Sequence, residues 1–291
     1  MSDYFKKNSS RFNFKKFVSS VIVEDVGNGD HTSLSIISPD QIGRMKLLVK
    51  EEGIIAGVEA AERIFKEFSE KIKVKSLIKD GQRVRKGDIV FHVNGPVLLL
   101  LAAERLVLNV MQRMSGIATK TYDLQKRCSN TKTKLLDTRK TTPGFRFFEK
   151  WAVAIGGGQN HRYGLYDMIL IKDNHIDFAG GIDEAIVACK DYLKRKKLNL
   201  KIEVEVRSMD DIKAVMKHKG IFRILIDNFS PSATEKAITF IRGCSSKIQT
   251  ESSGGISEKN IAAYAKTGVD FISVGALTHH VQSLDLSLKA Y

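Results

Sequence analysis

The second half of the chain alternates short apolar segments with helical spacers, and this alternation limits the folds that the chain can adopt. The apolar segments predict strands at 134–137, 168–171, 201–206, 224–226, 248–251 and 271–274. Strands that are joined through helices usually pair in parallel, so this half predicts a parallel α/β sheet, closed or open. The number of such units suits an α/β barrel.

The first third of the chain has a mixed pattern, with strand-like stretches at 44–51, 54–55, 74–78 and 88–93. Helical spacing is visible at 57–68, and a helix followed by a turn is expected near 14–38. A long helix is predicted over 98–127, because Pro96 suits the position where a helix starts. Ser115 and Gly116 mark a point where that helix could break.

Amino-acid composition and net charge limit the classes of protein to which this chain can belong and the partners that it can bind. The 291 residues are 43% hydrophobic and carry a formal net charge of +14, which favours anionic partners such as nucleic acid, membrane surfaces or phosphorylated metabolites. The longest apolar runs are too short to span a bilayer, and the N-terminus lacks an apolar signal core. Three scattered cysteines argue against a disulfide framework. We therefore expect a globular, cytoplasmic protein.

Polar side chains follow nearly every predicted strand in the second half. The carboxyl ends of parallel strands in a barrel face one rim, where active sites sit. One charged residue after a strand is more often a helix cap, but the repetition at successive strands favours a functional site. These strand-end residues include Asp137, Thr138, Arg139 and Lys140, then Lys172, Asp173, Asn174 and His175, then Glu203 and Glu205, Asp227 and Asn228, and Glu251.

The last two strands are followed by loops of small residues that each lead toward a helix. Such loops expose backbone N–H groups, which bind phosphate well. A single Gly–Gly turn is weak support for a phosphate site, because tight turns use glycine anyway. Two such loops at the last two strands predict a phosphate site made of Ser252, Ser253, Gly254 and Gly255 together with Ser273, Val274, Gly275 and Ala276.

Five basic side chains lie at loop-like positions, and their clustering predicts a polyanionic ligand. Arginine binds carboxylates through two N–H groups, whereas lysine acts as a point charge. The five are Arg139, Lys140, His161, Arg162 and Lys172. Glu205 and Asp227 supply the opposite charge. They can hold ribose hydroxyls, bind Mg²⁺ or stabilise a developing cation, and they can also pair with Lys140 or Lys172.

Several long motifs, in this order along the chain, resemble those of the quinolinate phosphoribosyltransferase family. They are EDVGNGDHTS (24–33), ERLVLNVMQRMSGIAT (104–119), DTRKTTPG (137–144), GGGQNHRYGLYDMILIKDNHI (156–176), EVEV (203–206), IDNF (226–229), ESSGGI (251–256) and SVGALTH (273–279). The resemblance runs from about residue 20 to the end. The departures, an isoleucine at Ile226 where the family more often has leucine and a basic N-terminal arm, do not touch the chemistry.

The resemblance implies a two-part α/β fold. Residues 1–115 would form an N-terminal α/β (open-faced) sandwich, to which residues 277–291 return. Residues 116–276 would form an incomplete parallel α/β barrel that carries the phosphoribosyltransferase site.

The same resemblance implies roles for individual residues. Quinolinate would contact Arg139, His161, Arg162 and Lys172, with Arg105 reaching in from a neighbouring subunit. Lys140, Glu205 and Asp227 would surround the ribose and pyrophosphate of phosphoribosyl pyrophosphate, the two acids also serving Mg²⁺, directly or through water or substrate. Segments 252–255 and 273–276 would hold the 5′-phosphate.

The implied activity joins quinolinate to phosphoribosyl pyrophosphate, with Mg²⁺, to give nicotinate mononucleotide, pyrophosphate and CO2 in de novo NAD synthesis. The implied assembly is a homodimer or a larger homo-oligomer with shared active sites, without nucleic acid or membrane. Two alternatives remain open: a related pyridine or molybdenum-linked phosphoribosyl enzyme of the same fold, and a basic nucleic-acid-binding protein. No RNA- or DNA-binding motif is visible in support of the latter.

Overall fold

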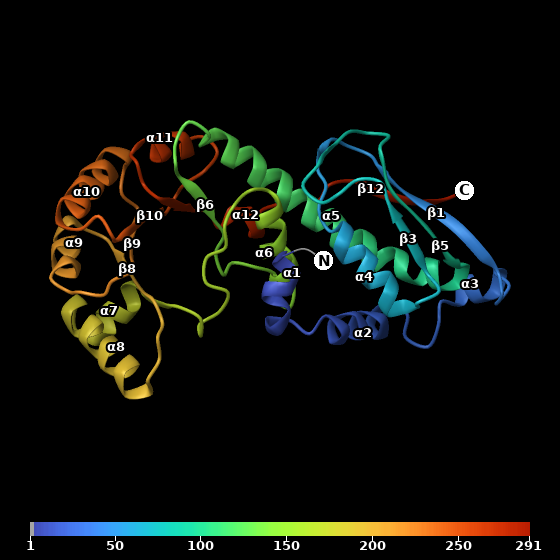
Figure 1. Ribbon diagram of the computed structural model, residues 1–291, viewed down its shortest axis with the longest axis horizontal. Helices are drawn as coiled ribbons and strands as arrows, with labels where there is room; N and C mark the ends of the chain where they lie inside the picture. The colour runs from blue at the N-terminus through green and yellow to red at the C-terminus, as the bar shows by residue number, and fades with distance from the viewer. Residues whose placement is uncertain (1–2) are drawn as a thin grey trace. The chain divides into compact units, whose positions relative to one another are not determined.

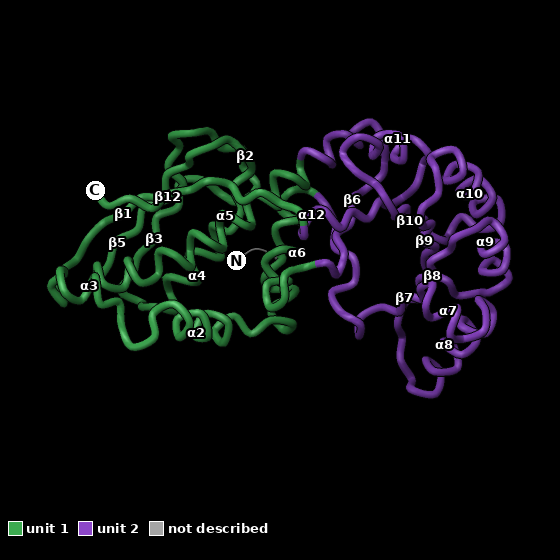
Figure 2. Tube along the Cα trace, turned by 180° about the vertical axis from the view of Figure 1, so that it is seen from behind, with its two compact units in different colours: residues 1–122, 141–157, 280–291 green, residues 123–140, 158–279 purple. Residues whose placement is uncertain are grey.

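The computed structural model describes residues 3–291, which divide into two compact units (Figures 1 and 2). Unit 1 contains the chain up to Tyr122 together with residues 141–157 and 280–291. Unit 2 contains residues 123–140 and 158–279. The domain limits expected from the sequence, after residues 115 and 276, stay predictions.

Unit 1 is built on a four-stranded antiparallel sheet in the order β12-β1-β5-β3. The last strand of the chain pairs with the first, Leu288 lying opposite Leu47. The strands are β1 (Ile42–Val49), β3 (Lys73–Ser76), β5 (Ile89–Pro96) and β12 (Leu286–Ala290), and the short pair β2 (Gly53–Ile54) and β4 (Arg83–Val84) stands apart.

Helices pack against one face of this sheet. Along β1 the side chains alternate between buried and more exposed, as expected for a sheet with one covered face. Phe65 of α4 (Val58–Phe68) contacts Phe91 of β5 edge-on, with ring centroids 6.1 Å apart. Asp80 fixes the start of α4, because its carboxylate accepts hydrogen bonds from the N–H groups of Val58 and Glu59.

The long helix α5 (Val97–Arg127) runs through Ser115 and Gly116 without a break, so the interruption considered above is wrong. Both residues make close contacts within unit 1 instead. Ser115 Oγ bonds both the N–H and the C=O of Ala56. A Cβ on Gly116 would lie 2.2 Å from the carbonyl oxygen of Gln282, so only glycine allows this approach.

The N-terminal arm of unit 1 is anchored by aromatic side chains. Phe12 stacks on Phe147 with ring centroids 4.6 Å apart, and Phe17 lies 5.0 Å from Phe148. The phenylalanines at 147 and 148 belong to α6 (Arg146–Ile155), and the arm consists of α1 (Asp3–Asn8), the 3-10 turn Ser9–Arg11 and α2 (Phe14–Asp25). The short helix α3 (His31–Ile36) follows, capped by Asp30.

Unit 2 is built on a six-stranded sheet in which every pair is parallel, in the order β6-β11-β10-β9-β8-β7. The chain returns from β11 to pair with β6, so the sheet curls, while β6 and β7 form its two edges. The strands are β6 (Lys134–Leu136), β7 (Ile169–Ile171), β8 (Ile202–Val206), β9 (Arg223–Asp227), β10 (Gln249–Ser253) and β11 (Phe271–Ser273).

The helices of unit 2 lie outside this sheet (Figure 1). They are α7 (Asp173–Ala179), α8 (Ile182–Lys196), α9 (Met209–Met216), α10 (Pro231–Cys244) and α11 (Ile261–Lys266), followed by the single turn α12 (Ala276–His279). The open parallel barrel of unit 2 and the separate antiparallel sheet of unit 1 confirm the predicted α/β fold class. No helix between residues 3 and 291 is long and apolar enough to cross a bilayer.

Candidate active site

A cavity of about 720 Å³ opens at the carboxyl ends of the parallel strands of unit 2. It is lined by most of the residues that the sequence singled out, from separate strand ends and loops. These are Arg139, Lys140, His161, Arg162, Lys172, Glu205, Asp227, Ser253, Gly254, Gly255, Ser273, Val274, Gly275 and Ala276. The parallel sheet therefore gathers the predicted side chains in one place.

Two predicted residues do not line this cavity. The side chain of Ser252 is only 1% exposed and alternates with the inward-facing Glu251 and Ser253 along β10, so it is buried away from the cavity. Arg105 lies on the exposed face of α5 in unit 1.

The basic wall of the cavity holds two arginines that repel one another. Burial lowers the pKa of the Arg162 guanidinium, and the charge of Arg139 lowers it further. Arg162 Nη1 donates to the carbonyl oxygen of Met168 at 3.1 Å, which fixes the side chain in place. Like charges held together in this way are stabilised by an anion placed between them, so this wall suits carboxylates or phosphates.

The acidic residues of the cavity are already hydrogen-bonded within unit 2. Glu205 is 7% exposed and forms an ion pair with Lys172, whose Nζ lies 2.9 Å from Glu205 Oε2. Asp227 accepts from Ser253 Oγ at one oxygen and from Asn228 Nδ2, at 2.6 Å, at the other. The pairing of Glu205 with Lys172 that the sequence allowed is thus present.

The glycine-rich loop after β10 adopts a conformation that needs glycine. Gly254 and Gly255 have φ values of +87° and +58°. A Cβ on Gly254 would lie 2.1 Å from Asn228 Oδ1 and 2.7 Å from the Asn228 backbone nitrogen. The loop does not lead directly into a helix as expected, because α11 begins only at Ile261.

The loop after β11 closes against the residue that follows Arg139. Thr278 Oγ1 donates to the carbonyl oxygen of Lys140 at 2.8 Å and lies 3.2 Å from that of Gly275. A Cβ on Gly275 would lie 3.0 Å from Lys140 Cδ, so the small residue leaves room for the lysine stem. Lys140 therefore lies beside the loop at 273–276 and lines the cavity.

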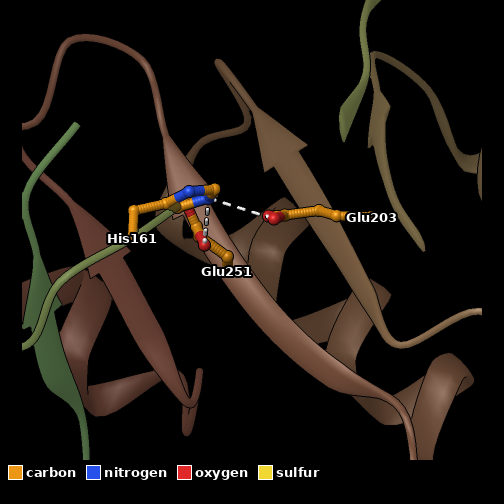
Figure 3. Close-up of side chains that lie close together, drawn as sticks. All are labelled: His161, Glu203 and Glu251. Carbon is orange, nitrogen blue, oxygen red and sulfur yellow. Dashed lines mark ion pairs between the residues drawn. The ribbon is translucent and has the colours of Figure 1, made fainter. Parts of the chain in front are cut away.

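A buried acidic pair, of which Glu251 lines the cavity, was not assigned a role from the sequence. Glu203 and Glu251 are fully buried, and both approach the ring of His161 (Figure 3). Burial raises the pKa of Glu203, and burial together with the charge of Glu203 raises the pKa of Glu251 to about 7. The signals that could have found them were Glu203 in the otherwise apolar strand that carries EVEV, and Glu251 at the start of ESSGGI.

This acidic pair predicts a pH-dependent stability. The carboxyl pKa of Glu251 is raised on folding from its ordinary 4.5, so the stability that the protonated group contributes is complete below pH 4.5 and is lost as pH rises through 7. Between pH 5 and 8 the wild-type chain should therefore lose about 2–3 kcal/mol more than a Glu251→Gln variant. Urea unfolding at both pH values measures this, and equal losses would contradict it.

The three side chains of this cluster could in principle hold a metal ion, since His161, Glu203 and Glu251 offer ligand atoms within 4.8 Å of one another. Arg223 argues against that use. Its Nη1 lies 2.7 Å from Glu251 Oε2, so a guanidinium already neutralises the carboxylate that a cation would need.

Comparison with known proteins gives consistent results over nearly the whole chain. The family models for the N- and C-terminal domains of quinolinate phosphoribosyl transferase match residues 30–115 and 117–289. Quinolinate phosphoribosyltransferase [decarboxylating] 2, mitochondrial, of Nicotiana glauca is 40% identical over 293 residues, covering 96% of this chain and 82% of the relative. The chloroplastic nicotinate-nucleotide pyrophosphorylase [carboxylating] of Arabidopsis thaliana is also 40% identical, with 96% and 83% covered.

Solved structures of the same family have the same fold. The nicotinate-nucleotide pyrophosphorylase of Francisella tularensis superposes with a TM-score of 0.87 at 40% identity, with 96% of each chain covered. That of Ehrlichia chaffeensis gives 0.86 at 33% identity, with 96% of this chain and 99% of that chain covered. With both family models matched in order and relatives at this identity along most of its length, the chain belongs to the quinolinate phosphoribosyltransferase family.

Proposed function

We propose that this protein transfers the phosphoribosyl group of phosphoribosyl pyrophosphate to quinolinate and releases CO2, giving nicotinate mononucleotide and pyrophosphate. The observation that carries the proposal is the cavity of unit 2, which two mutually repelling arginines and two glycine- and serine-rich loops line together. One wall suits a dicarboxylate and the other suits a phosphate. The names of the relatives agree with this reaction.

Quinolinate would bind at the basic wall of the cavity. Arg139 and Arg162 would each bind a carboxylate through two N–H groups, and Lys172 would add a compact positive charge. His161 lines the same cavity. Holding the dianion in a fixed pose beside the sugar converts a bimolecular reaction into an effectively unimolecular one, which supports a large part of the rate.

Phosphoribosyl pyrophosphate would bind on the side of the cavity that the two loops form. The loops at 253–255 and 273–276 would hold the 5′-phosphate through backbone N–H groups. Lys140 would neutralise the leaving pyrophosphate, while Glu205 and Asp227 would bind the ribose hydroxyls and stabilise positive charge that develops at C1 of the sugar.

Mg²⁺ fits the acidic residues of this cavity. Each oxygen of Asp227 accepts one hydrogen bond, which leaves lone pairs for water, and Glu205 uses one oxygen for Lys172. Mg²⁺ prefers such carboxylates, keeps several waters and binds substrate phosphates. Glu205 and Asp227 would hold it, through water or through the pyrophosphate. When bound, it would supply charge neutralisation on the leaving group.

The bond changes follow from the two substrates. The pyridine nitrogen bonds to C1 of the ribose while the bond from C1 to the pyrophosphate oxygen breaks, and that electron pair leaves with pyrophosphate. The ring nitrogen is then cationic. When the 2-carboxylate leaves as CO2, its bonding electrons remain on ring carbon 2 beside this positive nitrogen, and a proton takes the place of CO2. The protein needs no covalent nucleophile for either step.

The direct test follows product formation from quinolinate. Purified protein with quinolinate, phosphoribosyl pyrophosphate and Mg²⁺ should yield nicotinate mononucleotide and CO2 in equal amounts. Omitting phosphoribosyl pyrophosphate should stop CO2 release. Chelation by EDTA should also stop it, and added Mg²⁺ should restore it. CO2 release without the sugar substrate, or full activity in EDTA, would overturn the corresponding part of the proposal.

The two alternative functions give different results in the same experiments. A related phosphoribosyl enzyme that uses nicotinate would form product from nicotinate without CO2 release, because that acceptor has only one carboxylate. A nucleic-acid-binding protein would shift arbitrary RNA with a steep dependence on salt concentration. We expect neither result, because the basic residues converge on a cavity with acidic partners.

We further propose a cytoplasmic homodimer in which Arg105 completes the site of the neighbouring subunit. Arg105 is exposed on α5 and lies outside the cavity-lining set of unit 2. If it acts across a subunit boundary, mixing Arg105→Ala and Arg139→Ala chains should restore about a quarter of the activity at a quinolinate concentration too low for either variant alone, because half of the random dimers contain one intact site. No recovery after unfolding and refolding the mixture would exclude the shared site.

A further inference from the structure

A column of buried ionisable side chains runs through the interior of the barrel, and the proposed reaction leaves most of it unused. It starts with Arg223, the first residue of β9, and reaches the cavity at His161 through Glu251 and Glu203. Arg223 is 7% exposed and both glutamates are fully buried. Barrel interiors are usually filled by branched apolar side chains, and buried charges are costly unless they are paired.

Arg223 is held tightly at the lower end of this column. Its Nη1 donates to Glu251 Oε2 at 2.7 Å, and its Nη2 donates to Gln249 Oε1 at 2.9 Å. The guanidinium carbon lies 4.3 Å from the ring centroid of Phe271. A planar group with several donors can make these contacts together, which a lysine ammonium cannot.

At the upper end, both ring nitrogens of His161 face protein groups. Nε2 lies 3.0 Å from Glu203 Oε2 and 3.5 Å from Glu251 Oε2, as the dashed lines of Figure 3 show. Nδ1 accepts a hydrogen bond from the backbone N–H of Arg162 at 2.7 Å. A ring nitrogen that accepts carries no proton, so this geometry corresponds to the neutral ring with its proton on Nε2, the nitrogen that lies beside the carboxyl groups.

His161 thereby links the buried column to the basic wall of the cavity. Its ring orients the backbone of Arg162, whose guanidinium donates to Met168 and lines the cavity. The backbone N–H of His161 itself donates to the buried Asp137 at 2.9 Å, so the segment is fixed from two sides. A displacement of the ring would move the Arg162 backbone with it.

We propose that Arg223, Glu251 and Glu203 are positioning residues that set the orientation of the His161 ring and, through it, place Arg162 for a substrate carboxylate. The inference rests on the proposed function for the identity of the substrate, quinolinate. It assigns His161 an indirect role, in which the ring nitrogens contact protein groups and Arg162 contacts the substrate.

The kinetic test replaces Arg223 with methionine, which keeps an unbranched apolar stem and removes the charged guanidinium group. The KM for quinolinate should rise about tenfold or more, while the KM for phosphoribosyl pyrophosphate stays within about twofold. Arg242→Met is the matched control, because Arg242 forms an exposed ion pair in the same unit, with Asp270. It should leave both constants unchanged.

Two more variants keep the proposal testable if Arg223→Met folds poorly. Arg223→Lys restores the charge and should recover part of the quinolinate affinity. The double variant Arg223→Met/Glu251→Gln removes the unpaired carboxylate and should fold, yet keep the raised KM for quinolinate, because the column still cannot orient His161. If the variants only lower the yield of folded protein and leave both KM values unchanged, the column has a purely structural role and the proposal is overturned.

A spectroscopic measurement tests the orientation of His161 without any activity. The imidazole ¹⁵N shifts of His161, assigned by comparison with His161→Gln, should show Nδ1 unprotonated and Nε2 protonated in the substrate-free wild-type chain. Arg223→Met should move the Nε2 shift, because the carboxyl groups that lie beside this nitrogen lose their counter-charge. A proton on Nδ1 in the wild-type chain, or no change in Arg223→Met, would overturn the inference even if quinolinate is the substrate.

Discussion

An Arg139→Ala variant is expected to show a KM for quinolinate about 30- to 1,000-fold above that of the wild-type chain. Arg139 lies on the basic wall of the cavity, where its charge lowers the pKa of Arg162. Removing it leaves one substrate carboxylate without its charged partner, which corresponds to about 2–4 kcal/mol of lost binding. Steady-state kinetics with quinolinate as the varied substrate measure the effect.

The controls for this prediction separate charge from geometry. Arg139→Lys keeps the charge but loses the paired donors, so its KM should lie between those of the alanine variant and the wild-type chain. Arg207→Ala removes an arginine of the same unit whose exposed partner is Asp177, and it should change nothing. A wild-type KM for quinolinate in Arg139→Ala would show that the basic wall binds something else.

A Gly254→Ala variant is expected to lose phosphoribosyl pyrophosphate binding by about 100-fold or more, since the loop that would hold the 5′-phosphate cannot keep its shape. The new Cβ would meet the Asn228 backbone nitrogen at 2.7 Å, and φ at this position is +87°. Backbone cannot give way as a flexible side chain can, so the loop must move. The KM for phosphoribosyl pyrophosphate should rise while the fold of the barrel persists.

Gly180→Ala is the matched control for backbone strain. Gly180 has a φ of +90°, ends α7 and has open space where a Cβ would point. It therefore carries the same conformational strain as Gly254 without the clash and outside the cavity. If the two alanine variants showed equal kinetic losses, strain alone would explain the effect and the phosphate role of the loop would be wrong.

Much of the fold could be predicted because strands of unit 2 are short apolar runs separated by amphipathic helices. The ends of the strands at 202–206 and 223–227 fall within one residue of their predicted limits. Topology then brings the polar strand ends to one side of the sheet, so the cavity follows from the pattern. The motifs at 137–144 and 251–256 indicated the family and its substrates only through resemblance.

What sequence patterns missed depends on contacts between distant segments. The glycine in the middle of α5, Gly116, is explained by the close approach of Gln282, which no local propensity signals. The column that joins Arg223 to His161 draws on four separate segments, and each member alone resembles an ordinary charged residue. What marks these charged residues as a set is that they are buried inside the barrel, and burial is a property of the folded chain.

A crystal structure of the protein with quinolinate bound tests the central claim most directly. The account predicts the pyridine ring in the cavity of unit 2, with its two carboxylates contacting Arg139, Arg162 and Lys172. Quinolinate bound elsewhere, or seated there with a carboxylate that touches none of these three side chains, would contradict the account.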